Sequence, residues 1–280
     1  MSSKVISRLL VFFIGIPLII CLVMFNSLNH LALHIVITFM SVAAADELFN
    51  IFSQNFKLQN RVFVDILTAL TPLSGIICAL TGWDLSLMTY VFVCSVLLSL
   101  SIEVISAQTF EDSNSKIITS ISIIFYSGYL FSFLMRMAFF EHSRECLILF
   151  LMMVFFCDSF AWLFGNLFGK NNKGLIKASP NKSVAGFIGG FLGSVLAGVL
   201  AWYLWRELFL GSVIKIILLG ILTAFTSIIG DLVESVYKRS SNCKDSGTLI
   251  PGRGGVLDSI DSVVFSAPVF YLAVSHLYCL

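Results

Sequence analysis

Near the end of the sequence, four carboxylates form two closely spaced pairs. Asp231 and Glu234 are three residues apart, and so are Asp258 and Asp261. In a helix, this spacing places both members of a pair on one face. Carboxylate oxygens are ligands that Mg²⁺ prefers, and Mg²⁺ completes its coordination shell with water and substrate phosphate. The two pairs therefore indicate chemistry on a phosphate, assisted by a divalent cation.

The segment between the two pairs carries the positive charge that a phosphate site needs. It contains Lys238, Arg239, Lys244 and Arg253, and Arg253 lies in the glycine-rich run Pro251-Gly-Arg-Gly-Gly255. Arginine and lysine bind phosphate oxygens through charge-assisted hydrogen bonds. Glycine lets the backbone approach a phosphate closely. The segment thus favours an anionic substrate that bears phosphates.

A second polar segment, residues 169–183, has the features of a helix start. We read Ser179-Pro180 as an N-cap followed by proline at the first helical position, so that the next helix directs free N–H groups at the aqueous boundary. Lys182 would lie beside this helix end, which attracts anions. Ser179 and Lys182 are therefore candidates for contact with a phosphate.

The elements that position these charges are overwhelmingly apolar. Of the 280 residues, 58% are hydrophobic and 12% are charged, whereas soluble domains carry about 25% charged residues. The mean hydropathy is +0.96. A water-soluble enzyme is therefore excluded, and the formal net charge of +1 gives no overall field that would attract nucleic acid.

A membrane-spanning helix needs about 20 largely apolar residues, and the sequence contains nine such windows. They are approximately 9–25, 31–49, 62–80, 85–105, 117–135, 147–168, 184–205, 212–236 and 256–278. We predict an all-α polytopic membrane protein with about nine transmembrane helices. Spans one to five would occupy residues 1–150, and spans six to nine would form a catalytic region in residues 151–280.

The distribution of lysine and arginine predicts the orientation of these spans. If the connections alternate between the two sides, thirteen of the seventeen cations lie on one side, among them Lys4 and Arg8. Cytoplasmic connections carry the excess of positive charge. We therefore expect a cytoplasmic N-terminus and polar segments 169–183 and 237–255 that face the cytoplasm. A compact chain without a soluble tail favours a bacterial cytoplasmic, or inner, membrane.

The polar segment around the carboxylate pairs resembles the signature of phosphatidate cytidylyltransferases, also called CDP-diacylglycerol synthases. Residues 235–247, 251–255 and 258–261 are similar to S-x-x-K-R-x4-K-D-x-G, P-G-H-G-G and D-R-x-D, and residues 230–235 are similar to G-D-L-x-E-S. A weaker upstream block spans Asp158 to Lys170 and residues 179–183. The chain departs from the family pattern at Arg253, where histidine is usual, and at Ser259, where arginine is usual.

The resemblance implies that CTP and phosphatidate give CDP-diacylglycerol and pyrophosphate at a membrane lipid surface, with Mg²⁺ as cofactor and room for a second cation. It implies a metal-binding role for Asp231, Asp258 and Asp261, with Glu234 as an outer partner. These three aspartates, Lys244 and the lysine-orienting Asp245 would be catalytic. The substrate-binding residues would be Ser179, Lys182, Ser235, Lys238, Arg239, Arg253, Gly254 and Gly255.

Two other functions remain compatible with the residues. Carboxylates within apolar spans also mark ion pathways, so an ion-coupled transporter is one alternative. An inactive member of the same family is another, because of the departures at 253 and 259. The pattern of CDP-alcohol phosphotransferases, D-G-x2-A-R…G-x3-D-x3-D, is absent from the sequence.

The remaining charges and small residues favour structural roles. We interpret Asp46, Glu47, Asp65 and Glu103 as counter-charges to Lys57, Arg61 or Lys116, and leave Asp158 open between a site role and a structural hydrogen bond. Glycines at three- and four-residue spacing in the seventh window predict close helix packing and permit a homodimer without requiring one. They are Gly186, Gly189, Gly190, Gly193 and Gly198.

Overall fold

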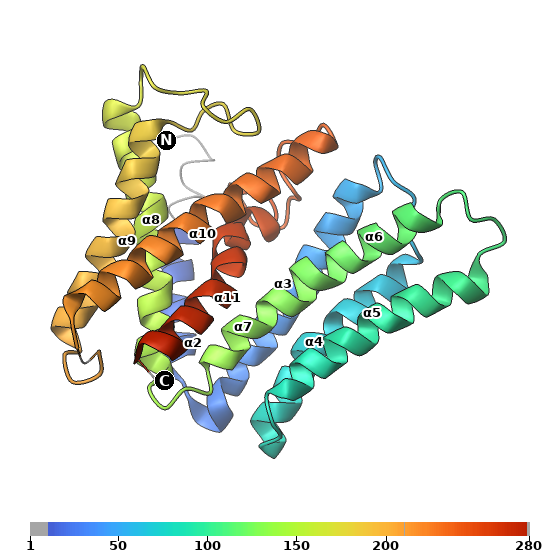
Figure 1. The fold of residues 1–280 in the computed structure, drawn as a ribbon, viewed down its shortest axis with the longest axis horizontal. Helices are drawn as coiled ribbons and strands as arrows, with labels where there is room; N and C mark the ends of the chain where they lie inside the picture. Colours follow the sequence, from blue (N-terminus) through green and yellow to red (C-terminus); the bar gives the residue numbers. More distant parts are fainter. Residues whose placement is uncertain (1–10, 210, 279–280) are drawn as a thin grey trace. The chain divides into compact units, whose positions relative to one another are not determined.

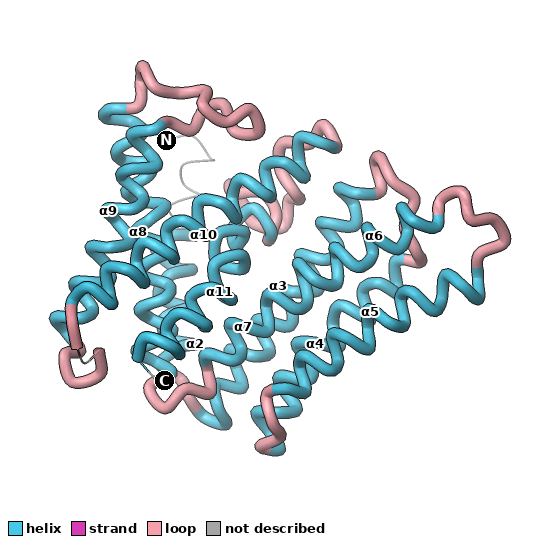
Figure 2. Tube along the Cα trace, viewed as in Figure 1, coloured by secondary structure: helices cyan, strands magenta, loops and turns pink. Residues whose placement is uncertain are grey.

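The computed structural model describes residues 11–209 and 211–278, which form helices joined by loops (Figure 1). Two π-helical segments are η1 (Val11–Gly15) and η2 (Ile124–Tyr129). The α-helices are α2 (Ile16–Met24), α3 (Ser27–Phe52), α4 (Arg61–Thr81), α5 (Ser86–Ser106), α6 (Ser113–Ile123), α7 (Leu130–Met137), α8 (Ser143–Phe168), α9 (Val184–Leu204), α10 (Val213–Ser240) and α11 (Leu257–Tyr278). Figure 2 shows loops only at the helix ends and no strand among these described residues.

The helices confirm the prediction of an all-α polytopic membrane protein. Eight helical segments are long and apolar enough to cross a membrane, with α6, η2 and α7 counted as the single segment Ser113–Met137. They match the second to ninth windows. The first window holds a shorter apolar helix, Phe13–Met24, so the count of nine spans stays a prediction. The orientation of the N-terminus also stays a prediction, and Lys4 and Arg8 lie outside the described residues.

The described chain divides into two compact units, each made of two stretches of sequence. The first unit comprises the chain up to Ala138 together with Tyr237–Ile260. The second comprises Phe139–Val236 and the chain from Asp261 onward. The predicted division at residue 150 concerns which part of the chain carries the chemistry, and it stays a prediction.

In the first unit, α3 packs against α4, and α4 packs against α5 and η2 (Figure 1). The polar segment that follows α10 is attached to the C-terminal end of α3. The Ser241 hydroxyl donates to the carbonyl of Ile51 at 2.7 Å, the Asn55 amide donates to the carbonyl of Ser240, and the rings of Phe52 and Tyr237 meet edge to face. The end of α3 therefore fixes where this segment begins.

In the second unit, α8 and α9 pack almost backbone to backbone along a row of glycines. A Cβ on Gly186 would lie 3.0 Å from the carbonyl oxygen of Ala161, and one on Gly189 would lie 2.7 Å from that of Phe160. One on Gly193 would collide with the carbonyl of Phe156. The prediction that these glycines permit close helix packing is confirmed, and the packing is within the chain.

Candidate functional site

The glycine-rich run forms a tight turn directly before α11. The amide of Ile250 donates to the carbonyl of Gly254 at 2.8 Å, and the amide of Gly254 donates back to the carbonyl of Ile250 at 3.1 Å. Gly254 has φ of +116°, a conformation that side-chain-bearing residues rarely adopt. A Cβ there would also lie 2.5 Å from Oδ2 of Asp258. The turn therefore requires glycine for its backbone and for the space beside Asp258.

The carboxylate of Asp258, in the first turn of α11, is held by four donors of the first unit. Its Oδ1 accepts from Nζ of Lys238 at 2.6 Å. Its Oδ2 accepts from the Ser246 amide at 2.7 Å, the Ser246 hydroxyl at 2.9 Å and the Gly255 amide at 2.8 Å. The predicted site residues Lys238, Gly255 and Asp258 are thus in direct contact.

A third carboxylate, that of Glu47 in α3, binds the same segment. It accepts hydrogen bonds from the amides of Val256 and Leu257, each at 2.8 Å, and from the Ser246 hydroxyl at 3.0 Å. The interpretation of Glu47 as a counter-charge to Lys57, Arg61 or Lys116 is wrong, because its oxygens bind amides and a hydroxyl. A signal for this role was available, since the start of α11 lacks an N-cap side chain at Val256.

Two of the other predicted counter-charges are confirmed. Arg61 forms an ion pair with Asp46, and Lys116 lies 3.4 Å from Glu103. Asp46 and Glu47 are therefore adjacent in sequence but have different partners. This difference makes Asp46 a useful control for experiments on Glu47.

The remaining cations of the 237–255 segment lie at the surface of the first unit. Arg239, Lys244 and Arg253 are exposed, and Arg239 donates to the carbonyl of Cys243 at 3.4 Å. Asp245 is also exposed, and its Cβ lies 3.4 Å from where a Cβ on Gly254 would be. Because these long side chains extend into solvent, they are accessible to an anionic ligand.

The second unit holds the other predicted site residues. Nζ of Lys182 lies 2.6 Å from Oδ2 of Asp231, and the Ser235 hydroxyl lies 3.5 Å from Oδ1 of Asp231. The structure therefore brings together Lys182, from the segment before α9, with the first carboxylate pair on α10.

Asp261 is buried in the second unit beside other carboxylates. Those of Asp231, Glu234 and Asp158 lie close enough to act on it electrostatically, and Oδ1 of Asp261 accepts from the Ser262 amide at 2.6 Å. The approach of α10 and α11 is close here, since a Cβ on Gly230 would lie 2.8 Å from the Asp261 carbonyl oxygen. Glycine at 230 thus allows the two helices to bring these carboxylates together.

The N-cap of α9 corrects one sequence interpretation. Ser183, with the extended backbone typical of an N-cap, accepts from the Gly186 amide at 3.0 Å. Ser179 instead belongs to a turn in which the Lys182 amide donates to its carbonyl at 3.1 Å. Reading Ser179-Pro180 as the helix start is therefore wrong, because the chain makes this turn before the helix begins. Substrate contact by Ser179 stays a prediction.

The donor chemistry of the second unit fits a divalent cation. Glu234 and Asp261 are buried, and carboxylates gathered in this way repel one another unless positive charge neutralises them. Mg²⁺ usually takes one or two carboxylates and completes its shell with water and phosphate oxygens. Within residues 11–209 and 211–278, no three His, Cys, Asp or Glu side chains are arranged as a ready-made metal site.

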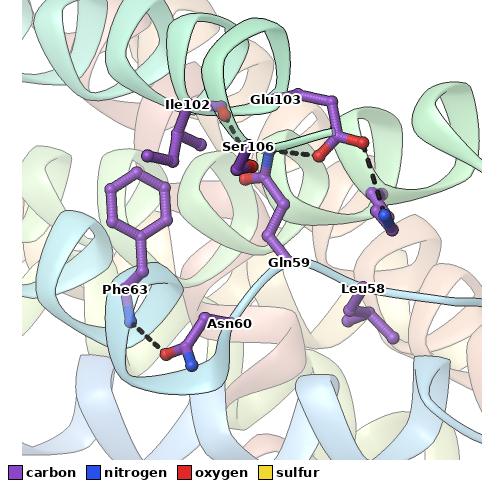
Figure 3. A pocket seen from close by; sticks show the side chains of 8 residues that line it. Leu58, Gln59, Asn60, Phe63, Ile102, Glu103 and Ser106 are labelled. Carbon is purple, nitrogen blue, oxygen red and sulfur yellow. Dashed lines mark hydrogen bonds and ion pairs between the residues drawn. The ribbon is translucent and has the colours of Figure 1, made fainter. Parts of the chain in front are cut away.

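A pocket of about 340 Å³ in the first unit is lined by residues outside both groups (Figure 3). Its polar side chains bind one another: the Gln59 amide donates to the Ser99 carbonyl at 2.8 Å and lies 3.5 Å from Glu103, which pairs with Lys116. These contacts join α5 and α6 to the segment that precedes α4. The pocket is thus explained as part of the packing of these helices.

The predicted residues consequently form two groups, one in each unit. The first contains Lys238, Arg239, Lys244, Asp245, Arg253, Gly254, Gly255 and Asp258, and the second contains Ser179, Lys182, Asp231, Glu234, Ser235 and Asp261. Asp258 and Asp261 are one helical turn apart in α11. Each group combines carboxylates with cations, which is the composition that binding a metal ion together with phosphates requires.

Comparisons with known proteins point in the same direction. The model of the cytidylyltransferase family matches residues 6–277. The chain is 38% identical over 131 residues to a phosphatidate cytidylyltransferase of Haemophilus influenzae, a match that covers 46% of this chain and 45% of that protein.

Two further relatives bear the same name. The chain is 40% identical over 119 residues to a phosphatidate cytidylyltransferase of Synechocystis, covering 42% of this chain and 39% of that protein. It is 40% identical over 116 residues to the chloroplastic phosphatidate cytidylyltransferase 5 of Arabidopsis thaliana, covering 41% of this chain and 28% of that protein. The matched stretch thus spans less than half the length of each of the three relatives.

Proposed function

Because this chain belongs to the cytidylyltransferase family, we propose that it is an integral-membrane phosphatidate cytidylyltransferase. The observation that carries the proposal is the ordered signature segment, in which the Pro251–Gly255 turn, Ser246 and Lys238 hold the carboxylate of Asp258. The names of the relatives support the choice of CTP and phosphatidate as substrates.

The proposed reaction joins two anionic substrates. A phosphate oxygen of phosphatidate attacks the α-phosphorus of CTP, the bond from that phosphorus to the bridging oxygen breaks, and pyrophosphate leaves with the electron pair. CDP-diacylglycerol stays in the membrane. Little covalent chemistry is required of the protein, so positioning and neutralisation of negative charge supply most of the rate enhancement.

The cations of the 237–255 segment suit the binding of CTP. Arg239, Lys244 and Arg253 are exposed, so that they can close on the triphosphate, and the backbone of Gly254 and Gly255 lets a phosphate approach closely. Asp245 orients Lys244. Lys182, Ser179 and Ser235 would contact nucleotide or lipid phosphate from the second unit.

The carboxylates suit a cation. Asp231, Asp258 and Asp261 would hold Mg²⁺, with Glu234 as an outer partner that orients them. When bound, Mg²⁺ would neutralise charge on the reacting phosphates and leave room for a second cation. The ion pairs with Lys182 and Lys238 orient the carboxylates of Asp231 and Asp258.

We further propose that the protein lies in a bacterial cytoplasmic membrane with segments 169–183 and 237–255 facing the cytoplasm. The excess of lysine and arginine in these connections supports this orientation, as does the need for soluble CTP. The glycine row of α9 packs on α8 within the chain, so it supplies no argument for a homodimer.

An assay of the purified protein tests the function. The protein in detergent micelles receives CTP, phosphatidate and Mg²⁺, and both CDP-diacylglycerol and pyrophosphate are measured. We expect equal amounts of the two products, and no product when CTP or phosphatidate is omitted.

A control separates this function from the alternatives. A bacterial relative assayed in the same micelles shows that the conditions support turnover. If the relative is active and this protein forms no product, the proposed function is wrong. CTP binding without turnover would then indicate an inactive family member, and ion flux in liposomes would indicate a transporter.

A further inference from the structure

Glu47 supplies the cap that the first turn of α11 lacks in its own sequence. The first amides of a helix have no partner within the helix, and a carboxylate at this end also interacts favourably with the helix dipole. Here the amides of Val256 and Leu257 donate to Oε1 and Oε2 of Glu47, each at 2.8 Å. Val256 and Leu257 lie 209 and 210 residues further along the chain than Glu47. The cap of α11 therefore comes from α3.

The Glu47 side chain is buried and closely packed against the backbone of the glycine-rich segment. The side chain is 5% exposed. A Cβ on Gly247 would lie 2.6 Å from Oε1 of Glu47, and one on Gly255 would collide with the same carboxylate. Because Gly247 and Gly255 have no side chain, the Glu47 carboxylate can lie against the backbone of the 246–257 segment.

The contact between Glu47 and Asp258 runs through Ser246. The Ser246 hydroxyl lies 3.0 Å from Oε2 of Glu47 and 2.9 Å from Oδ2 of Asp258. A hydroxyl has one hydrogen, so it donates to one carboxylate at a time. The Ser246 amide also donates to Asp258 at 2.7 Å. Displacing Glu47 would therefore remove one partner of Ser246, the residue whose hydroxyl and amide both contact Asp258.

We propose that Glu47 is a positioning residue for the proposed reaction, which sets the glycine-rich turn, the start of α11 and the carboxylate of Asp258 in their working geometry. The inference rests on the proposed function for its catalytic consequence. It assigns to α3, outside the signature segment, a direct part in the site.

Glu47→Gln is the sharpest test, because it keeps the shape of the side chain. The amide NH₂ of glutamine would face one of the two backbone N–H groups, so a donor would meet a donor. Replacing partners that orient metal-binding or reacting groups typically costs 10- to 100-fold in activity. We expect kcat to fall about tenfold or more, while KM for phosphatidate stays within about twofold.

Asp46→Asn is the matched control. It is the neighbouring residue on the same helix, and its ion pair with Arg61 is half-exposed, so it contributes little. We expect its kcat to stay within about twofold of the wild-type value. If Glu47→Gln and Asp46→Asn have the same kcat as the wild type, the proposal is overturned.

A double-mutant cycle tests the geometry independently. Gly247→Ala places a methyl group 2.6 Å from Oε1 of Glu47, so it should lower kcat in the wild type. In the Glu47→Ala background, that methyl group has space, and the added loss should be several-fold smaller. Additive losses would contradict a direct contact.

Hydrogen exchange separates this inference from the proposed function. Faster exchange of the Val256 and Leu257 amides in Glu47→Gln than in Asp46→Asn is expected whether or not the protein turns over CTP. A wild-type protein without activity would overturn the proposed function and the catalytic consequence. An active protein with unchanged exchange in Glu47→Gln would overturn the positioning role alone.

A second variant covers the case in which Glu47→Gln does not fold. Ser246→Ala must then still lower kcat, and a wild-type kcat in Ser246→Ala would overturn the inference.

Discussion

The ammonium of Lys238 lies 2.6 Å from Oδ1 of Asp258, with only 12% and 8% of the two side chains exposed. Ion pairs that are sheltered in this way become costly when one partner is removed, because the other charge is left without compensation. Lys238 therefore stabilises the carboxylate of Asp258, in addition to its proposed contribution of positive charge to a phosphate site.

Lys238→Met should lower both stability and activity, whereas Arg239→Met should lower activity alone. The first variant removes the cation that pairs with Asp258, at a cost of about 3 kcal/mol. The second removes an exposed cation, which changes stability by no more than about 0.5 kcal/mol. Thermal unfolding in detergent compares the two. Equal melting temperatures would show that the ion pair contributes nothing to stability.

Asp261→Asn should abolish turnover without lowering the melting temperature. Asparagine keeps the size of the side chain, and removing one negative charge relieves the repulsion from Asp231, Glu234 and Asp158. An amide is a much poorer ligand for Mg²⁺ than a carboxylate, so we expect a loss of about 100-fold or more in kcat. A near-normal rate would refute the metal-binding role of Asp261.

Gly254→Ala should lower kcat about tenfold or more, because the new methyl group would lie 2.5 Å from Oδ2 of Asp258. Gly174→Ala is the matched control. Gly174 also has positive φ, +83°, but no atom lies within 4 Å of its missing Cβ. This pair separates backbone strain, which both variants share, from the collision with Asp258. Equal losses in the two variants would mean that strain alone explains the effect.

Two of the departures from the family pattern, Arg253 and Ser259, should compensate for each other. Arg253 adds a cation beside the glycines, and Ser259 lacks the one that the family usually carries. The double variant Arg253→His with Ser259→Arg should therefore keep a kcat within about tenfold of the wild type. An inactive but folded double variant would contradict this compensation.

The orientation of the spans can be measured by cysteine labelling. Lys177 and Glu207 are exposed and lie on either side of α9, so they should face opposite sides of the membrane. In a cysteine-free background, a membrane-impermeant maleimide should label Lys177→Cys only from the cytoplasmic side and Glu207→Cys only from the other. The reverse pattern would invert the proposed topology.

The helices were predictable because lipid leaves the backbone few choices. A chain segment in the membrane must satisfy its N–H and C=O groups internally, so length and apolarity are enough to locate a helix. The window 62–80 matches Arg61–Thr81 because local signals agree: the Asn60 side chain accepts from the Phe63 amide, and Gly82 ends the helix with φ of +73°.

The failures concern contacts that the local sequence does not encode. Ser179 and Ser183 both precede the seventh window, and only the turn between them decides which one caps α9. Glu47 resembles any carboxylate near a helix end, and its partners lie about 200 residues later. The absence of a capping side chain at Val256 was a clue, but it does not identify the residue that replaces it.

The capping of α11 by Glu47 also affects the order in which the site can form during synthesis of the chain. Glu47 leaves the ribosome long before Val256 and Leu257, which lie 209 and 210 residues later. At 5–20 residues per second, the interval is roughly 10–40 s. During this interval, the Glu47 carboxylate is present without the hydroxyl and the amides that it binds in the folded protein. A chain terminated before α11 contains Glu47 but lacks Asp258 and Asp261, so we expect no activity from it.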